Sequence, residues 1–220
     1  VLFGVWSTAV TWNNVMVADV NGDGRADVIG REQENGNWWA GINNGVNFTN
    51  VLFGNLDSSI SWLDVMKADI NGDGKDDVIA RNNTGDWIAG INNGVNFTNV
   101  IFGAWSPDVT WNNVMIADIN GDGKADVIGR EQGTGNWVGG ISNGVVFVNS
   151  NLGNWPIEFN WLDVQLADVN GDGLPDILPD IIGRAEQTGD WIISINTGTG
   201  FNNSIFSSWN PGSGWTDAIA

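Results

Sequence analysis

Short apolar runs separated by polar turns follow one another along this chain. Near the N-terminus they fall at 15–19, 27–31, 38–42 and 48–53, rich in Val, Ile, Trp and Phe and bounded by Gly, Asn or Asp. No apolar pattern with a helical period persists for the length of a helix. The pattern therefore predicts four short antiparallel strands in each stretch of about 50 residues.

This four-run unit occurs four times. The Asp residues that open the equivalent polar loops are 19, 69, 118 and 168, at intervals of 50, 49 and 50 residues. A period near 50 is typical of propeller blades and is longer than that of most helical repeats. We expect an all-β fold, a β-propeller of four-stranded antiparallel blades, with residues 1–220 forming a single repeat array or part of one. A parallel β-helix is the alternative, although its coils are usually shorter.

The ends and the fourth unit depart from strict repetition. Residues 1–18 resemble 204–220, which predicts an extra fourth strand at the front and an extra first strand, near Trp215, at the back. A larger ring cut at both ends, or assembly with further repeats or other chains, explains these strands better than a closed four-bladed ring. The segment 176–184 holds four more residues than 27–31, and Pro179 within it predicts a bulge or protruding loop.

The loops at 19–27, 69–77, 118–126 and 168–176 share the pattern Asp-x-Asn-x-Asp-Gly-x-x-Asp. Three carboxylates in nine residues repel one another unless a cation neutralises them. Side-chain oxygens at positions 1, 3, 5 and 9, with the carbonyl of position 7, suit Ca²⁺ better than Mg²⁺, which prefers a small octahedron and keeps its water. The predicted ligands, about one Ca²⁺ per repeat, are Asp19, Asn21, Asp23, Arg25 and Asp27; Asp69, Asn71, Asp73, Lys75 and Asp77; Asp118, Asn120, Asp122, Lys124 and Asp126; and Asp168, Asn170, Asp172, Leu174 and Asp176.

Two other interpretations of these loops are weaker. An EF-hand needs a bidentate Glu at position 12 and flanking helices, whereas position 12 here is Gly30, Ala80, Gly129 or Pro179 and the flanks are β. A plain Asx-rich hairpin turn would not require every ligand position to recur in four copies. Four Ca²⁺ ions would reduce the formal charge from −18 to about −10.

Composition excludes several classes of function. The chain lacks His and Cys, which removes the usual nucleophilic triads and zinc sites. A formal charge of −18 without a basic stripe disfavours nucleic acid, and no apolar run is long enough for membrane insertion. A carboxylate pair of the glycosidase kind is the remaining catalytic route, but most carboxylates lie in the loops and no Glu recurs in all four units. We expect no enzymatic activity.

Fourteen Trp residues need an explanation. The column Trp12, Trp62, Trp111 and Trp161 suits the wedge between neighbouring blades. Two further columns recur at equivalent positions: Arg31, Arg81, Arg130 and Arg184, and Trp38, Trp87, Trp137 and Trp191. These side chains either pack in the core or offer a sugar aromatic rings for stacking and polar groups for hydrogen bonds. Several weak sites on one array would bind a multivalent glycan by avidity.

The recurring strand, Asp-x-Asn-x-Asp-Gly-x-x-Asp loop and second strand resemble FG-GAP (VCBS-type) repeats, the calcium-binding blades of integrin-α-like propellers. The units are similar to those of bacterial extracellular proteins of this class and of Psathyrella velutina-type propeller lectins. The resemblance covers the whole chain and implies a propeller with Ca²⁺ between the first two strands of each blade. Phe53-Gly54 and Phe102-Gly103 retain the Phe-Gly, but Gly-Arg or Ala-Arg replaces Gly-Ala-Pro, which weakens an integrin-like inference about partners.

The expected function is therefore that of an extracellular or cell-surface binding or adhesion module. Carbohydrate is the favoured partner, and a cell-surface or matrix protein is the alternative. The lectin interpretation predicts that the Arg31 and Trp38 columns are exposed and line pockets between blades. A structural or adhesive scaffold predicts that they are buried. A third possibility is a non-catalytic appendage of a polysaccharide-degrading enzyme.

Overall fold

The computed structural model describes residues 4–171 and 178–210, which form sixteen strands and no helix. Contacts divide the chain into two compact units, Val1–Pro107 with Asn143–Phe147, and Asp108–Ser142 with Val148–Ala220. Among the described residues no helix is long and apolar enough to cross a membrane. Each unit is described separately below.

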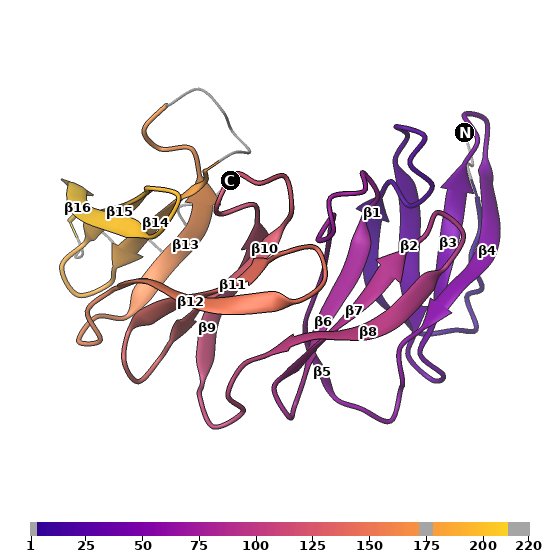
Figure 1. The fold of residues 1–220 in the computed structure, drawn as a ribbon, viewed down its shortest axis with the longest axis horizontal. Helices are drawn as coiled ribbons and strands as arrows, with labels where there is room; N and C mark the ends of the chain where they lie inside the picture. The colour runs from indigo at the N-terminus through magenta and orange to yellow at the C-terminus, as the bar shows by residue number, and fades with distance from the viewer. Residues whose placement is uncertain (1–3, 172–177, 211–220) are drawn as a thin grey trace. The chain divides into compact units, whose positions relative to one another are not determined.

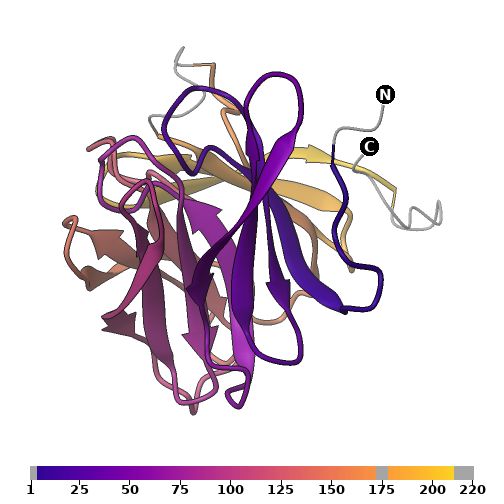
Figure 2. The ribbon, with the colours of Figure 1, turned by 90° about the vertical axis from the view of Figure 1, so that its right-hand side faces the viewer.

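Each repeat forms one four-stranded antiparallel sheet, here called blades 1 to 4 in chain order (Figure 1). Consecutive strands are neighbours, so every blade is a simple meander, and Figure 2 shows the alternating strand directions and their twist. The strands are β1 (Trp12–Ala18), β2 (Asp27–Glu32), β3 (Asn37–Asn43) and β4 (Phe48–Asn55); β5 (Trp62–Ala68), β6 (Asp77–Asn82), β7 (Asp86–Asn92) and β8 (Phe97–Ala104); β9 (Trp111–Ala117), β10 (Asp126–Glu131), β11 (Asn136–Ser142) and β12 (Phe147–Asn154); and β13 (Trp161–Ala167), β14 (Asp180–Ala185), β15 (Asp190–Asn196) and β16 (Phe201–Ser208).

The predicted fold class is confirmed: the protein is all-β and its sheets are blades of the β-propeller type. The first strand of blade 1 begins at Trp12, earlier than the apolar run indicated. A bulge allows this extension, because Asn14 adopts a positive φ of 51° and the register shifts between Asn13 and Met16. Asp64, Asn113 and Asp163 repeat this conformation in the other blades.

The middle strands are the most buried, and aromatic contacts join neighbouring blades. In the first unit, Phe97 of blade 2 packs edge-on against Phe53 and Trp38 of blade 1, with ring centroids 4.8 and 6.2 Å apart. In the second unit, Trp155 lies after β12 and its indole Nε1 donates a hydrogen bond to Ser194 Oγ of blade 4 at 2.6 Å. Large apolar side chains therefore fill the wedges between blades.

In the Trp12 column only Trp161 is as buried as the core interpretation predicted. Trp12 and Trp62 are half-buried and Trp161 is buried. Each indole N–H donates to a backbone carbonyl earlier in the chain, at 3.0 Å to Ser7, 2.7 Å to Asp57 and 3.0 Å to Pro156. These bonds hold the turn that leads into the first strand of the blade.

The sequence predicts an extra strand at each end of the chain, and neither is seen among the described residues. At the front, residues 4–10 form no strand, and residues 1–3 lie outside the described part. Gly4 nevertheless packs on Phe48 as Gly54 packs on Phe97, so a Cβ added to Gly4 would lie 3.0 Å from Phe48 Cβ. The strand expected near Trp215 lies outside the described residues.

Candidate metal loops and a polar pocket

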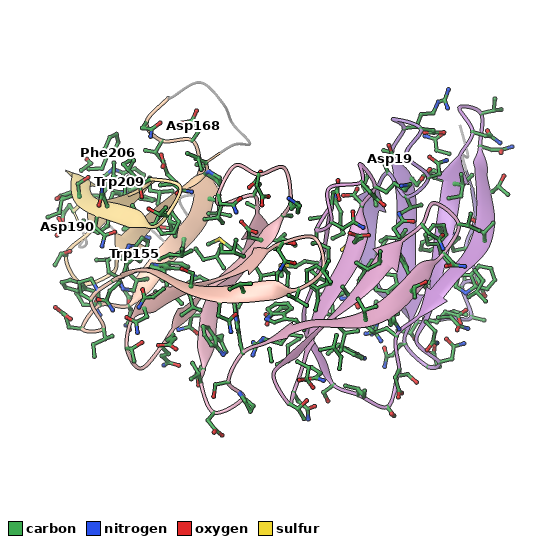
Figure 3. All side chains as sticks on the ribbon, viewed as in Figure 1. Asp19, Trp155, Asp168, Asp190, Phe206 and Trp209 are labelled. Atoms are coloured by element: carbon green, nitrogen blue, oxygen red, sulfur yellow. The ribbon has the colours of Figure 1, made fainter. Side chains whose placement is uncertain are left out.

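The loop after the first strand of each blade folds around its first carboxylate. Gly22 and Gly24 adopt positive φ values of 72° and 80°, which turn their backbone N–H groups inward. Both N–H groups donate to the Asp19 carboxylate at 2.8 Å. The same pairs of bonds converge on Asp69 and on Asp118 at 2.7 Å. Figure 3 labels Asp19 and its counterpart Asp168, which follows β13.

The third and fifth positions form successive Asx turns. Asn21 Oδ1 accepts from the N–H of Asp23 at 2.9 Å, and Asp23 Oδ1 accepts from the N–H of Arg25 at 2.8 Å. The second and third loops repeat these bonds at 2.9 to 3.0 Å. Three of the four loops thus share one conformation at these predicted ligand positions, although the residue at the seventh position is Arg25 in the first loop and Lys in the other two.

The ninth-position carboxylate ties the loop to the sheet. Asp27 is fully buried; its Oδ2 accepts from Val20 N at 3.1 Å and its Oδ1 from Asn43 N at 2.7 Å. Asp77 and Asp126 make the equivalent two bonds in their own blades. The third strand of the blade therefore holds this carboxylate in place at the point where the loop enters the second strand.

The fourth loop departs from the sequence prediction. Asp180, rather than Asp176, makes the two ninth-position bonds, from Val169 N at 3.1 Å and Asn196 N at 2.8 Å. The sequence 174–181 reads Leu-Pro-Asp-Ile twice, so an extra copy of this tetrapeptide separates Asp180 from the start of the loop. Asp172, Leu174 and Asp176 lie outside the described residues, as does most of the loop expected from Pro179. Pro179 itself directly precedes β14, where no ladder N–H is required.

Neighbouring loops are also tied to each other within each unit, which the sequence did not reveal. Asn92 Nδ2 donates to Val20 O of blade 1 at 2.8 Å and to Asp76 O at 2.9 Å. Asn196 Nδ2 donates to Ile119 O of blade 3 at 2.9 Å and to Pro179 O at 3.2 Å. A change in one loop can therefore reach the next blade through one amide.

The electrostatics of the ninth position reflect a buried negative charge. Burial, followed by repulsion from the carboxylates at the fifth and first positions, raises the pKa of Asp77 to about 7 against the lowering effect of its backbone hydrogen bonds. The same causes raise the pKa of Asp126 to about 6 and raise that of Asp27. At the fifth position, by contrast, each carboxylate pairs with the cation at the seventh: Asp23 with Arg25 at 3.0 Å, Asp73 with Lys75 at 3.2 Å and Asp122 with Lys124 at 3.3 Å.

The donor chemistry of the loops fits a hard cation. Each of the first three loops presents three carboxylates, one amide oxygen and one backbone carbonyl, an all-oxygen set. Backbone N–H groups of the loop bond the side chains at the first, third and fifth positions. No group of three carboxylates drawn together closely enough to hold a metal occurs within residues 4–171 and 178–210. Binding an ion would therefore require the fifth-position carboxylate to turn from its Arg or Lys partner toward the loop centre.

The Arg31 and Trp38 columns are buried, unlike the exposed surface that the lectin interpretation expected. As whole residues, the Arg positions range from 3% exposed at Arg184 to 8% at Arg31, and Trp191, at 8%, is the most exposed of the four Trp residues. In each blade the Arg of the second strand lies opposite the Trp of the third strand. Arg81 lies 5.8 Å from the ring of Trp87, and Arg184 lies 5.9 Å from that of Trp191. Burial is the arrangement that a scaffold interpretation predicts for these columns.

The partners of the Arg column alternate along the chain. Arg81 pairs with Asp64 and Arg184 with Asp163, each at 2.7 Å, through the positive-φ residue of the first-strand bulge. In blades 1 and 3 that residue is Asn14 or Asn113. Arg31 Nε donates to Asn14 Oδ1 at 3.2 Å, whereas Arg130 Nε has no hydrogen-bond partner in the described structure. The alternation of Asn-Asn with Leu-Asp after the Trp12 column is the sequence signal for this difference.

A polar pocket of about 460 Å³ opens beside Arg130 in the second unit. Asn112 and Asn113 lie near the start of β9, Arg130 lies near the end of β10, and the segment before β13 forms the opposite wall. This pocket lies at the start of β9, whereas the metal loop follows the end of that strand, roughly 20 Å away at about 3.3 Å per residue. Its lining residues are Asn112, Asn113, Arg130, Gln132, Ile157, Phe159, Asn160 and Trp161.

Two solved structures are similar to this chain, and the first of them supports the fold. An Agrocybe aegerita lectin, described as specifically recognising non-reducing terminal N-acetylglucosamine, is similar at a TM-score of 0.68 and 22% identity over 88% of this chain. The V. cholerae biofilm matrix protein Bap1 is similar at a TM-score of 0.41 and 16% identity over 87% of this chain. The chain spans 52% of the lectin and 28% of Bap1. No match was found among curated protein sequences.

The sequence profile of the FG-GAP-like repeat matches three consecutive windows, residues 19–80, 69–129 and 118–179. Each window begins at the first Asp of one loop and ends shortly after the next loop, so the three windows contain all four loops. Together they cover well over half of the chain. The chain belongs to the FG-GAP-like repeat family.

Proposed function

We propose that this chain is an extracellular, calcium-stabilised binding module whose partner is a carbohydrate. The polar pocket beside Arg130 is the observation on which the sugar assignment rests. It combines amide side chains from Asn112, Asn113 and Gln132 with an aromatic wall from Phe159 and Trp161. Sugars present hydroxyl groups that hydrogen-bond amides and apolar C–H faces that pack on aromatic rings.

The loops would supply rigidity in this function. The residues at positions 1, 3, 5, 7 and 9 would hold the ion, which would neutralise the clustered carboxylates and cross-link the turn. Asp27 and its equivalents would carry that constraint to the third strand through their bonds to backbone N–H groups. Extracellular modules bind Ca²⁺ at roughly 10⁻⁴–10⁻³ M, which supports a location outside the cell.

The buried carboxylates of the described residues are engaged in structural contacts and do not form a catalytic pair in the pocket. The buried acids at the ninth position are engaged by backbone N–H groups, and Asp64 and Asp163 are paired with Arg. The lining of the pocket contains no Asp or Glu. We therefore propose binding without catalysis.

An adhesive or structural scaffold is the second candidate, and burial of the Arg31 and Trp38 columns favours it. A glycan array in millimolar calcium, repeated with chelator, separates the two functions. Binding to a defined glycan that is lost in Asn112→Ala supports the lectin function. A blank array from protein whose melting temperature still rises with calcium would exclude it and favour the scaffold.

A further inference from the structure

The pocket beside Arg130 has a buried floor and an exposed rim. Arg130 is 6% exposed and lies at the floor, and Trp161, 9% exposed, belongs to the aromatic wall. Gln132, Ile157 and Asn160 lie at the rim, where Ile157 and Asn160 are exposed. A ligand that enters would thus meet amides first and the guanidinium last.

Arg130 is a buried cation without a counter-charge. No hydrogen bond or ion pair of its side chain is found within the described part of the chain, and its Nε is buried without a partner. The equivalent side chains in blades 2 and 4 each bind a carboxylate at 2.7 Å. The difference comes from one residue, because blade 3 has Asn113 where those blades have Asp64 and Asp163.

Such a group favours an anion from outside. Burial of a charge is costly unless an opposite charge and hydrogen bonds accompany it, and burial also lowers the pKa of Arg130. A guanidinium presents a planar fork of N–H donors that matches a carboxylate or a sulfate. Since the lining holds no acidic side chain, no residue of the pocket competes with such a ligand.

We propose that this pocket binds an acidic saccharide residue, with the carboxylate or sulfate of the sugar on Arg130. The hydroxyl groups of the sugar form hydrogen bonds with the amides of Asn112 and Gln132, and the apolar face of the sugar lies against the wall formed by Phe159 and Trp161. This assignment deepens the proposed function and rests on it for the sugar, but the anion on Arg130 rests on the unpaired guanidinium alone.

The formal charge of −18 opposes an anionic ligand at long range. At physiological ionic strength the screening length is about 8 Å, so distant carboxylates contribute little to binding inside the pocket. Binding should therefore be measured in about 0.15 M salt, where the screening length is short, and in millimolar calcium to occupy the proposed metal loops.

Titrations of the full chain followed by ¹⁵N NMR test the proposal, with D-glucuronate and D-glucose as a pair that differs only at C6. We expect glucuronate to shift the Arg130 Nε–H and Asn112 side-chain signals with at least tenfold higher affinity than glucose. D-glucose 6-sulfate distinguishes a sulfate source from a carboxylate source. Equal affinity for glucose and glucuronate would overturn the acidic preference, and an equal response to sodium acetate would overturn the saccharide assignment.

Asn113→Asp supplies the missing carboxylate and is expected to fold, because blades 2 and 4 carry Asp at this position. We expect it to reduce glucuronate affinity at least tenfold, as Arg130→Gln does. Asn14→Asp makes the same change beside Arg31 and leaves the Arg130 response unchanged. Undiminished glucuronate binding by Asn113→Asp would refute the role of the unpaired guanidinium. A neutral glycan that binds this pocket while glucuronate fails would refute the acidic class and leave the lectin function standing.

Discussion

Arg184 donates its Nε–H to Asp163 Oδ2 at 2.7 Å, and the two side chains are only 4% and 7% exposed. The carboxylate comes from the bulge of β13 and the guanidinium from β14, so the ion pair joins two strands beside Trp191. Breaking a buried pair by removing one partner leaves an uncompensated charge.

Asp163→Ala is therefore expected to destabilise the fold by about 3–5 kcal/mol. Asp163→Asn should cost less, roughly 1–3 kcal/mol, because an Asn oxygen still accepts from Arg, as Asn14 does in blade 1. Urea denaturation of both variants measures the difference. Equal losses for Ala and Asn would show that the hydrogen bond to Arg184 contributes nothing.

The wedge beside blade 4 makes a steric prediction. A Cβ on Gly183 would lie 2.7 Å from Cη2 of Trp155, the residue labelled in Figure 3. Gly183→Ala is expected to destabilise by about 1–3 kcal/mol through overpacking. In blade 2, Ala80 is equivalent to Gly183 and Leu56 to Trp155, and both lie in one buried cluster. The methyl group of Ala80 is thus accompanied by a side chain smaller than Trp.

A double-mutant cycle tests this size matching. Trp155→Leu should lose packing by itself, yet the penalty of Gly183→Ala should shrink by at least about 0.5 kcal/mol in the Trp155→Leu background. Additive losses would mean that the Gly183 and Trp155 positions are not coupled.

Asp180 offers a test of the fourth loop. Asp180→Ala removes the acceptor of the backbone N–H groups of Val169, Asn170 and Asn196 and is expected to cost about 2–5 kcal/mol. Glu158→Ala, at an exposed acid with no hydrogen bond in the described part of the chain, should change stability by less than about 0.5 kcal/mol. Deleting the segment 174–177 gives the fourth loop the spacing of the other three, and we expect that variant to fold with undiminished thermal stability. A loss of folding on deletion would contradict the equivalence of Asp180 and Asp27.

The ninth-position acids predict a dependence on pH. Without metal, the pKa of Asp77 is raised from 3.8 to about 7, so the folded state binds the proton more tightly than the unfolded state. Protein freed of metal with chelator should therefore gain stability as the pH falls from about 7.5 to about 5.5, by up to about 1.4 kcal/mol per pH unit. Ca²⁺ at the proposed sites would compete with the proton, so its stabilising effect should be largest above about pH 7. Melting curves with calcium and with chelator at each pH test this. Asp77→Asn is expected to reduce the slope of the chelator profile, and Asp126, whose pKa is raised to about 6, keeps part of it.

Repetition explains how much the sequence alone could predict. Strands such as Asp27–Glu32 and the loop carboxylates recur at fixed spacing, so their type and positions followed from pattern alone. Asp180 could not be distinguished from Asp176 in this way, because each lies in a copy of the same tetrapeptide and only the N–H donors of Val169 and Asn196 select between them.

The partners of the Arg column could be recognised in the sequence only once the fold was known. Burial of Arg130 depends on packing, and its lack of a carboxylate partner depends on Asn113, which lies on the neighbouring strand within a bulge that local pattern does not predict. The Asn92 bridge to Val20 joins two different blades and could be found only in three dimensions.

Calorimetric titration of the metal-free full chain with CaCl₂, with MgCl₂ as the comparison, tests most directly whether calcium binds the loops and stabilises the fold. We expect saturable binding of about one ion per loop in the millimolar range, weaker binding of Mg²⁺, and a rise in melting temperature that follows saturation. Asp118→Asn should lower the stoichiometry by one, whereas Glu158→Gln should leave it unchanged. A folded chain that takes up no calcium at millimolar concentration, and melts at the same temperature with chelator, would contradict a calcium-stabilised module.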